Sequence, residues 1–143
     1  MVALPSCHFQ LSVERSKPYP KSPRIIGEHI LKKRHELGLF QKDVALQLAV
    51  NEYTICNWEK NKTFPLVHYL PRIIEFLGYD SYPPPKTLGE RVAHRRRSLG
   101  FSRKRLAKML NVDEGTLARF ETGIAMPKAK WLQKLQRFLS DGS

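Results

Sequence analysis

The sequence has little of the chemistry that enzymes and metal proteins need. Its two cysteines, Cys7 and Cys56, are far apart and form no Cys-x-x-Cys motif, so reduced thiols are expected in place of a disulfide. The five histidines are scattered without the spacing of metal ligands. The sequence contains no phosphate-binding loop of the P-loop type, and no carboxylate pair stands beside a base or nucleophile. We therefore expect no enzymatic activity, no cofactor and no metal site.

Long apolar segments are also missing. No apolar run approaches the roughly 20 residues that a membrane-spanning helix needs. The first five residues lack the basic region and the apolar core of a secretory signal. These features predict an intracellular protein that does not associate with membranes. Residues 1–22 contain three prolines and repeat nothing that follows, so we interpret them as a flexible leader.

Acidic residues are scarce relative to basic ones. The sequence has 25 Lys and Arg residues against 13 Asp and Glu residues, a net charge of +12. The excess lies mainly in the second half, because residues 24–80 carry a net charge of +1 and residues 81–143 carry +9. A surface with such an excess attracts polyanions, nucleic acids above all. We expect the second half to bind phosphates more strongly than the first.

The chain contains an internal repeat. Residues 26–77 align without a gap onto residues 88–139, at a constant shift of 62 and with 16 identities in 52 positions. About fifty residues with their own apolar pattern suffice for a small core. The sequence therefore predicts two related domains, residues 23–78 and 87–140. The proline-rich linker between them, residues 79–86, is expected to be extended and stiff.

Each repeat predicts four helices, so the expected fold class is all-α. In the first repeat, the apolar spacing and the capping residues predict helices over 24–37 and 41–48, a third after Asn51 and a fourth after Pro65. In the second repeat they predict helices over 88–99 and 103–110, a third after Asp113 and a fourth after Pro127. Thr87 and Glu90 are spaced as a capping box, which marks a helix start. Gly38 and Gly100 are expected to end the first helix of each repeat in a left-handed conformation.

The second and third helices of each repeat have the pattern of a helix-turn-helix. Ala45 and Ala107 are small enough to let the two helices approach closely, and Val50 and Val112 fill the turn. The exposed face of the third helix is then free to enter the major groove of DNA.

The stretches 37–62 and 99–123 resemble the Cro/cI-type (XRE) repressors of phages and bacteria. The resemblance covers both repeats and implies two tandem lambda-repressor-like helix-turn-helix domains of about four helices each. It further implies a sequence-specific transcriptional regulator that binds double-stranded DNA. Such a protein is expected in the cytoplasm of a bacterium, at the nucleoid, and is bacterial or phage-encoded.

The resemblance also implies roles for individual residues. Base-reading positions lie on the third helix of each repeat and at its start: Asn51, Glu52, Tyr53, Asn57, Asp113, Glu114, Gly115, Thr116 and Arg119. Phosphate-binding positions flank that helix and open the second one: Gln41, Lys42, Lys60, Asn61, Lys62, Ser102, Arg103, Lys104, Thr122 and Gly123. The chemistry fits, because arginine can pair with guanine through two hydrogen bonds and asparagine can pair with adenine in the same way.

Two structural ion pairs follow from the same resemblance. They join Arg34 to Glu59 and Arg96 to Glu121, and all four residues are identities of the repeat. The first repeat departs from the family at Ala49, where a turn glycine is usual and a positive φ is needed; Asn111 tolerates that conformation better.

Two alternatives stay open at this point. The near-neutral first repeat carries Tyr53, Trp58 and Tyr69, so it could instead bind a partner protein, as an antitoxin or a polymerase-binding regulator does. A nucleoid-type protein that binds DNA without sequence preference is the second alternative. The oligomeric state is also left open.

Overall fold

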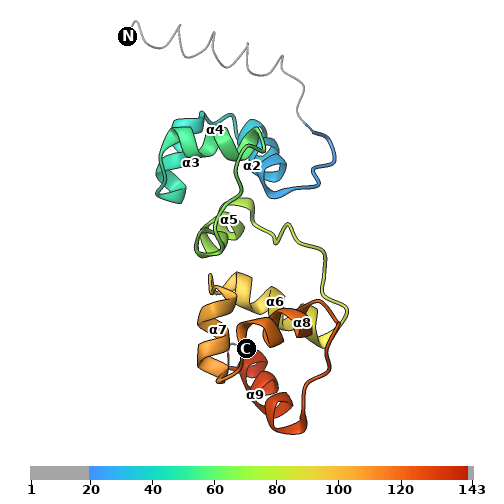
Figure 1. The fold of residues 1–143 in the computed structure, drawn as a ribbon. Coiled ribbons are helices and arrows are strands. Elements are labelled where there is room, and N and C mark those ends of the chain that lie inside the picture. Colours follow the sequence, from blue (N-terminus) through green and yellow to red (C-terminus); the bar gives the residue numbers. More distant parts are fainter. Residues whose placement is uncertain (1–19, 142–143) are drawn as a thin grey trace, which may run out of the picture. The chain divides into compact units, whose positions relative to one another are not determined.

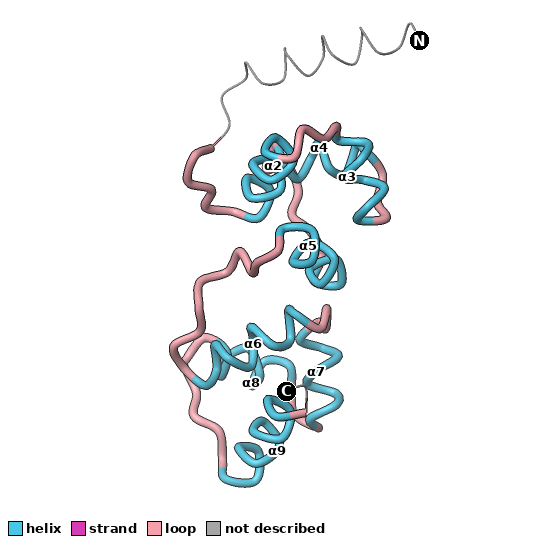
Figure 2. Tube along the Cα trace, turned by 180° about the vertical axis from the view of Figure 1, so that it is seen from behind, coloured by secondary structure: helices cyan, strands magenta, loops and turns pink. Residues whose placement is uncertain are grey.

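The computed structural model describes residues 20–141 of the chain. These residues form eight α-helices and one short 3₁₀ helix, with no strand, so the all-α prediction is confirmed (Figures 1 and 2). In chain order the elements are α2 (Ile26–Glu36), α3 (Gln41–Leu48), α4 (Glu52–Glu59), η1 (Val67–Tyr69), α5 (Leu70–Leu77), α6 (Leu88–Ser98), α7 (Arg103–Leu110), α8 (Glu114–Glu121) and α9 (Ala129–Ser140). Residues 1–19 of the predicted leader lie outside the described residues.

The first three helices of the two repeats begin and end at equivalent residues. A shift of 62 residues places α2 on α6, α3 on α7 and α4 on α8 with identical bounds. The same shift places η1 and α5 together on residues 129–139 of α9. The sequence repeat is therefore also a repeat of local structure.

The first helix is shorter than its predicted range of 24–37. It begins at Ile26, and Pro23 therefore lies before the helix and not in its first turn. The backbone N–H of Arg24 donates to the carboxylate of Glu28 at 2.8 Å, which holds the approach to the helix in a non-helical path. The equivalent helix α6 begins at Leu88, as predicted, and ends one residue earlier than expected, at Ser98.

The chain divides into two compact units. Within the described range, the first unit holds residues 20–65 and 76–81, and the second unit holds residues 66–75 and 82–141. This division groups most of α5 with the second unit, whereas the sequence assigns the whole of α5 to the domain 23–78. The predicted domain boundaries therefore stay predictions.

In the first unit, α2 and α3 both pack against α4. The contact surfaces are made of apolar side chains spaced three or four residues apart, and five of the large ones are buried: Ile30, Val44, Leu48, Ile55 and Trp58. Burial of each such side chain stabilises the fold by about 1.5–3 kcal/mol. The sequence predicts that Ile55 and Trp58 of the third helix point inward, and both are buried.

In the second unit, α6 and α7 pack against α8, and α9 packs against α6 and α7 (Figure 1). The buried core consists of Val92, Leu106, Ala107, Leu110, Leu117, Phe120, Trp131 and Leu135. The sequence predicts that Leu132, Leu135, Phe138 and Leu139 of α9 are buried. Leu135 is buried, but the other three are only half-buried. Trp131 fills the core instead, with its ring 5.0 Å from that of Phe120.

A similar correction applies to α5. The sequence predicts that Leu70, Ile73, Ile74 and Leu77 are buried. Ile74 is only half-buried, whereas the other three are buried. A helix that presents a stripe with a spacing of 3–4 residues cannot direct two adjacent residues equally inward, because neighbours lie about 100° apart around its axis.

One glycine in each repeat is required by close packing. A Cβ atom on Gly27 would lie 1.9 Å from the carbonyl oxygen of Trp58, and one on Gly89 would lie 2.1 Å from that of Phe120. Both distances are far below van der Waals contact. The first helix of each repeat therefore touches the end of the third helix backbone to backbone, which only glycine allows.

Candidate nucleic-acid interface

The turn between α7 and α8 is tight and fully hydrogen-bonded at its two ends. Asn111 has a φ of 55°, and Val112 donates its N–H to the carbonyl of Ala107 at 3.0 Å. The carboxylate of Asp113 then accepts from the N–H of Thr116 at 3.1 Å and caps α8, as predicted. This turn fixes the orientation of α8 relative to α7.

The turn between α3 and α4 has the same construction. Ala49 adopts a φ of 54°, which confirms that this position needs a left-handed backbone. Val50 donates to the carbonyl of Ala45 at 3.0 Å, and Asn51 caps α4 by accepting from the N–H of Thr54 at 3.2 Å. An alanine in this conformation costs about 1–2 kcal/mol, which asparagine largely avoids.

Helix α8 has one buried side and one exposed side. Leu117 and Phe120 point into the core, and all five predicted base-reading positions are exposed: Asp113, Glu114, Gly115, Thr116 and Arg119. Gly115 and Arg119 are one helical turn apart, so they share a face. Because Gly115 has no side chain, the backbone of α8 can approach a ligand closely at the turn before Arg119.

The matching side of α4 has a different character. Glu52 and Tyr53 are exposed, with 69% of Tyr53 accessible, whereas Asn57 is half-buried. The equivalent of Tyr53 in the second unit is Gly115, and the equivalent of Asn57 is Arg119. The first unit thus presents a bulky aromatic ring where the second presents an open backbone.

Each unit holds a buried, bidentate ion pair at the positions that the resemblance indicates. In the first, the Nε and Nη2 atoms of Arg34 donate to the two carboxylate oxygens of Glu59 at 2.6 and 3.0 Å. In the second, the same atoms of Arg96 donate to Glu121 at 2.7 and 3.1 Å. Each arginine also donates through Nη1 to a backbone carbonyl, of Leu39 or Phe101, at 3.0 and 2.9 Å.

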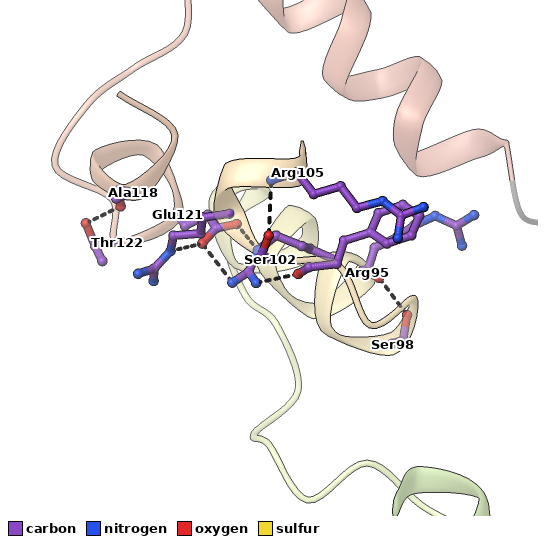
Figure 3. Close-up of polar contacts among 10 residues, drawn as sticks. Arg95, Ser98, Ser102, Arg105, Ala118, Glu121 and Thr122 are labelled. Carbon is purple, nitrogen blue, oxygen red and sulfur yellow. Dashed lines mark hydrogen bonds and ion pairs between the residues drawn. The ribbon is translucent and has the colours of Figure 1, made fainter. Parts of the chain in front are cut away.

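A third side chain completes each ion pair and was not predicted from the sequence. Gln41 donates to Glu59 at 2.7 Å, and Arg103 donates to Glu121 at 2.8 Å. Figure 3 shows the hydrogen bonds of the second cluster, which converge on Glu121. The first cluster is electrically neutral, whereas the second carries one excess positive charge. In the sequence, this third contact is indicated only by a hydrogen-bond donor 18 residues before the glutamate in both repeats.

Gln41 and Arg103 are also predicted phosphate-binding residues, and their geometry is compatible with both tasks. Arg103 begins α7 and its side chain is 44% exposed, so the guanidinium reaches from the buried Glu121 to the surface. The bond to Glu121 holds Nε in place and orients the remaining nitrogen atoms. Phosphate binding by either residue stays a prediction.

The other predicted phosphate-binding residues lie at the surface around these helix ends. The Ser102 hydroxyl accepts from the N–H of Arg105 at 3.1 Å, and Thr122 donates to the carbonyl of Ala118 at 2.9 Å (Figure 3). The remaining ones are exposed: Lys42, Lys60, Asn61, Lys62, Lys104 and Gly123. Asn61 and Gly123 occupy equivalent positions with φ values of 58° and 79°, so both loops turn in the same way.

Several other arginines of the second unit serve local packing. The guanidinium of Arg105 lies 4.1 Å from the centre of the Phe101 ring, and that of Arg97 lies 4.0 Å from the Tyr82 ring. Arg95 donates to the carbonyl of Phe138 at 3.1 Å and so ties α6 to the end of α9. The basic excess of the second unit therefore contributes to its fold as well as to its surface charge.

The predicted capping box at the start of α6 is present. Thr87 accepts from the N–H of Glu90 at 3.1 Å, and Glu90 accepts from the N–H groups of Lys86 and Thr87 at 2.6 and 3.3 Å. These backbone hydrogen bonds, that from Lys86 first, lower the pKa of Glu90 below its ordinary value. The carboxylate is therefore held in its ionised form at the helix start.

Within residues 20–141, no helix is both long and apolar enough to cross a membrane. Over the same range, no three His, Cys, Asp or Glu side chains come together as a metal site would require. Cys56 is a free thiol that is half-buried on α4.

A comparison with protein families supports the second unit as a helix-turn-helix domain. The family HTH_3, described as helix-turn-helix and of the XRE type, matches residues 92–140, which hold most of α6 and all of α7, α8 and α9. The match suggests DNA binding by this domain. Comparisons with curated proteins and with solved structures find no match.

Proposed function

We propose that this protein is a sequence-specific transcriptional regulator that binds double-stranded DNA through two fused helix-turn-helix domains, residues 23–78 and 87–140. The family match supports this role for the second domain. For the first domain, support comes from helix bounds at a shift of 62, the left-handed turn at Ala49 and the ion pair of Arg34 with Glu59. Each of these three features of the first domain has an equivalent in the second domain.

The exposed face of α8 is the observation that carries the proposal. In the proposed complex α8 lies in the major groove, where the Arg119 guanidinium donates to O6 and N7 of a guanine. Glu114 can accept from a cytosine amino group. A pairing of the kind proposed for Arg119 contributes about 1–3 kcal/mol of discrimination against the wrong base.

Phosphate contacts hold the domain in register. Arg103 and Lys104 begin α7 and face the DNA backbone on one side of α8, and the N–H groups near Thr122 and Gly123 face it on the other. These contacts add affinity for any sequence, and their strength falls with increasing salt because binding releases counterions.

Selection of bound sequences from a pool of random duplexes tests the proposal. A consensus with two half-sites is the expected result for two reading domains in one chain. A consensus with a single half-site would restrict the reading to one domain, and the absence of any enriched sequence would contradict sequence-specific regulation.

A second candidate function is supported by the surface of the first repeat. Leu46 on α3 is 81% exposed and Tyr53 on α4 is 69% exposed, and the equivalent residues of the second repeat are Lys108 and Gly115. An apolar surface of this kind favours contact with a partner protein. Replacing Leu46 by Lys and Tyr53 by Gly distinguishes the two: an unchanged DNA consensus supports a protein-binding face, and a lost half-site supports DNA reading.

A further inference from the structure

A cleft of about 450 Å³ lies in the second unit beside the predicted phosphate-binding residues. The prolines Pro83 to Pro85 and Lys86 form one wall, and Arg103 and Thr122 are on the surface that lines the same cleft. The cleft therefore joins the end of the linker to the start of α7 and the end of α8. No residue at this end of the linker is among the predicted site residues.

The backbone of Lys86 is fixed on both sides. The preceding prolines restrict the φ angles of the chain, and the N–H groups of Lys86 and Thr87 both donate to the Glu90 carboxylate. The Lys86 residue itself is exposed. Because its backbone is already ordered, its ammonium group can bind a ligand at a lower cost in conformational entropy than a lysine on a mobile segment.

The charges that line the cleft favour an anion. Three are positive, from Lys86, Arg97 and Arg103, and two are negative, from Glu90 and Glu121. The negative charge of Glu121 is already engaged by the buried Arg96, which donates to both of its carboxylate oxygens. The Glu90 carboxylate faces the backbone N–H groups of Lys86 and Thr87, so its charge is partly satisfied there.

We infer that Lys86 is a further phosphate-binding residue, which contacts a DNA backbone phosphate in this cleft next to the one bound by Arg103. The inference rests on the proposed DNA binding of the second domain. The first repeat has the same arrangement at its own start, because Arg24 is equivalent to Lys86 and its N–H donates to Glu28 at 2.8 Å. A basic residue thus precedes the first helix of both repeats, just outside the aligned segment.

The salt dependence of binding tests this inference. Each phosphate contact contributes about 0.9 to the slope of log affinity against log salt. Lys86→Gln is expected to reduce the magnitude of that slope by about 0.9. The loss of affinity between 50 and 200 mM salt is then smaller than that of the wild type by a factor of about 3.5. Lys130→Gln, on the exposed surface of α9 outside the cleft, removes the same charge and is expected to change the slope much less.

Protection of lysines from an amine-acetylating reagent gives a second measurement on the unmodified protein. A bound duplex is expected to protect Lys86 and to leave Lys130 reactive, as read by mass spectrometry. Protection of Lys86 by inorganic phosphate alone, at concentrations comparable with the duplex phosphates, would show a site for a free anion and overturn the assignment to DNA. Equal slopes for wild type and Lys86→Gln, with sequence selection intact, would also overturn it. Absence of sequence selection by the wild type would instead contradict the proposed function.

Discussion

The two units share one framework and differ in what they place on it. The first three helices of each repeat have the same bounds at a shift of 62, and the buried pairs Arg34–Glu59 and Arg96–Glu121 have nearly the same geometry. The third member of the buried cluster differs, because Gln41 leaves the first cluster neutral and Arg103 gives the second a positive charge. A few packing and hydrogen-bonding positions therefore specify this arrangement of helices, while the surface beside them is free to change in charge.

Removing the buried carboxylate should give the largest loss of stability, and the loss should differ between the two units. Glu121→Gln leaves Arg96 and Arg103 without their shared counter-charge, whereas Glu59→Gln leaves one arginine in that state. Removal of one partner from a buried pair costs about 3–5 kcal/mol, and we expect the larger loss at Glu121. Urea unfolding measures both losses.

The two tryptophans allow each unit to be followed separately. Trp58 lies in the first unit and Trp131 in the second. In the Trp131→Tyr background the fluorescence reports the first unit, and in the Trp58→Phe background it reports the second. Each substitution introduces the residue found at the equivalent position of the other repeat, which is Tyr69 for Trp131 and Phe120 for Trp58. A loss below about 1 kcal/mol at either glutamate would contradict the role assigned to the buried pairs.

Alanine at the close-packed glycines should destabilise both units to a similar extent. Gly27→Ala and Gly89→Ala each place a Cβ atom about 2 Å from a backbone carbonyl oxygen, which cannot move without displacing a helix. Overpacking of this kind costs about 1–3 kcal/mol or more. Thermal unfolding measures the loss.

Gly115→Ala is the matched control for these variants. Its Cβ would lie 2.9 Å from a carboxylate oxygen of Asp113, a side-chain atom that can shift. Alanine is the better helix former by about 1 kcal/mol, so this variant should be equally or more stable. Stable Gly27→Ala and Gly89→Ala variants would contradict backbone contact between the first and third helices.

Replacing the proposed base readers tests whether the two faces read DNA alike. Arg119→Ala should lose about 1–3 kcal/mol of discrimination at one base pair of the selected site, because no other side chain replaces its two hydrogen bonds. Asn57→Ala should lose less, since Asn57 is half-buried. Fluorescence anisotropy on the consensus and on scrambled duplexes measures both, and equal losses on the two duplexes would refute base reading by Arg119.

Exchange of the third cluster members tests the origin of the charge difference. Arg103→Gln should lower the salt slope of DNA binding by about 0.9, and Gln41→Arg should raise it if the first unit also meets phosphate. Both variants keep a hydrogen-bond donor for the buried glutamate, so the fold should persist. Binding measured on specific and random duplexes should change by the same factor, because phosphate contacts carry no base information.

The smallest expected effect concerns pH and involves the first unit alone. The ring nitrogen Nδ1 of His29 lies 2.8 Å from the hydroxyl of Tyr79, and burial lowers the pKa of His29. Below a pH of about 6.5 the unfolded chain then takes up a proton that the folded unit does not. Stability of the first unit should therefore decline as the pH falls below that value. The equivalent positions of the second repeat hold Arg91 and Asp141 in place of the histidine and the tyrosine.

Amide hydrogen exchange at several pH values measures this decline for each unit, after correction for the intrinsic exchange rate. His29→Gln removes the titrating group and should abolish the difference between pH 7 and pH 5. A decline that survives in the variant, or that is equal in the second unit, would assign the pH dependence to other groups.

The sequence predicted the helices well because their signals are local. Apolar residues with a spacing of three and four, the caps Asn51 and Asp113, and the box of Thr87 with Glu90 act within a few residues of the chain. The start of α2 and the core role of Trp131 were missed. The N–H of Arg24 binds Glu28 just before α2 begins, and Trp131, one helical turn before Leu135, packs on Phe120 in the core. The exposed positions of α8 were also predictable, since the apolar stripe of Leu117 and Phe120 leaves them on the opposite side.

The repeat, the helix content, the excess of positive charge in the second half and the face that α8 exposes all follow from the amino-acid sequence. The tertiary structure was needed to show that Arg103 shares the buried carboxylate of Glu121 with Arg96, that Gly27 and Gly89 lie against a carbonyl, and that Lys86 lines a cleft with Arg103. The physical reason is the range of the interactions. Helix signals act between neighbours in the chain, whereas a buried carboxylate, a backbone contact and a cleft each join residues that are 17 to 31 positions apart, and folding alone brings them together.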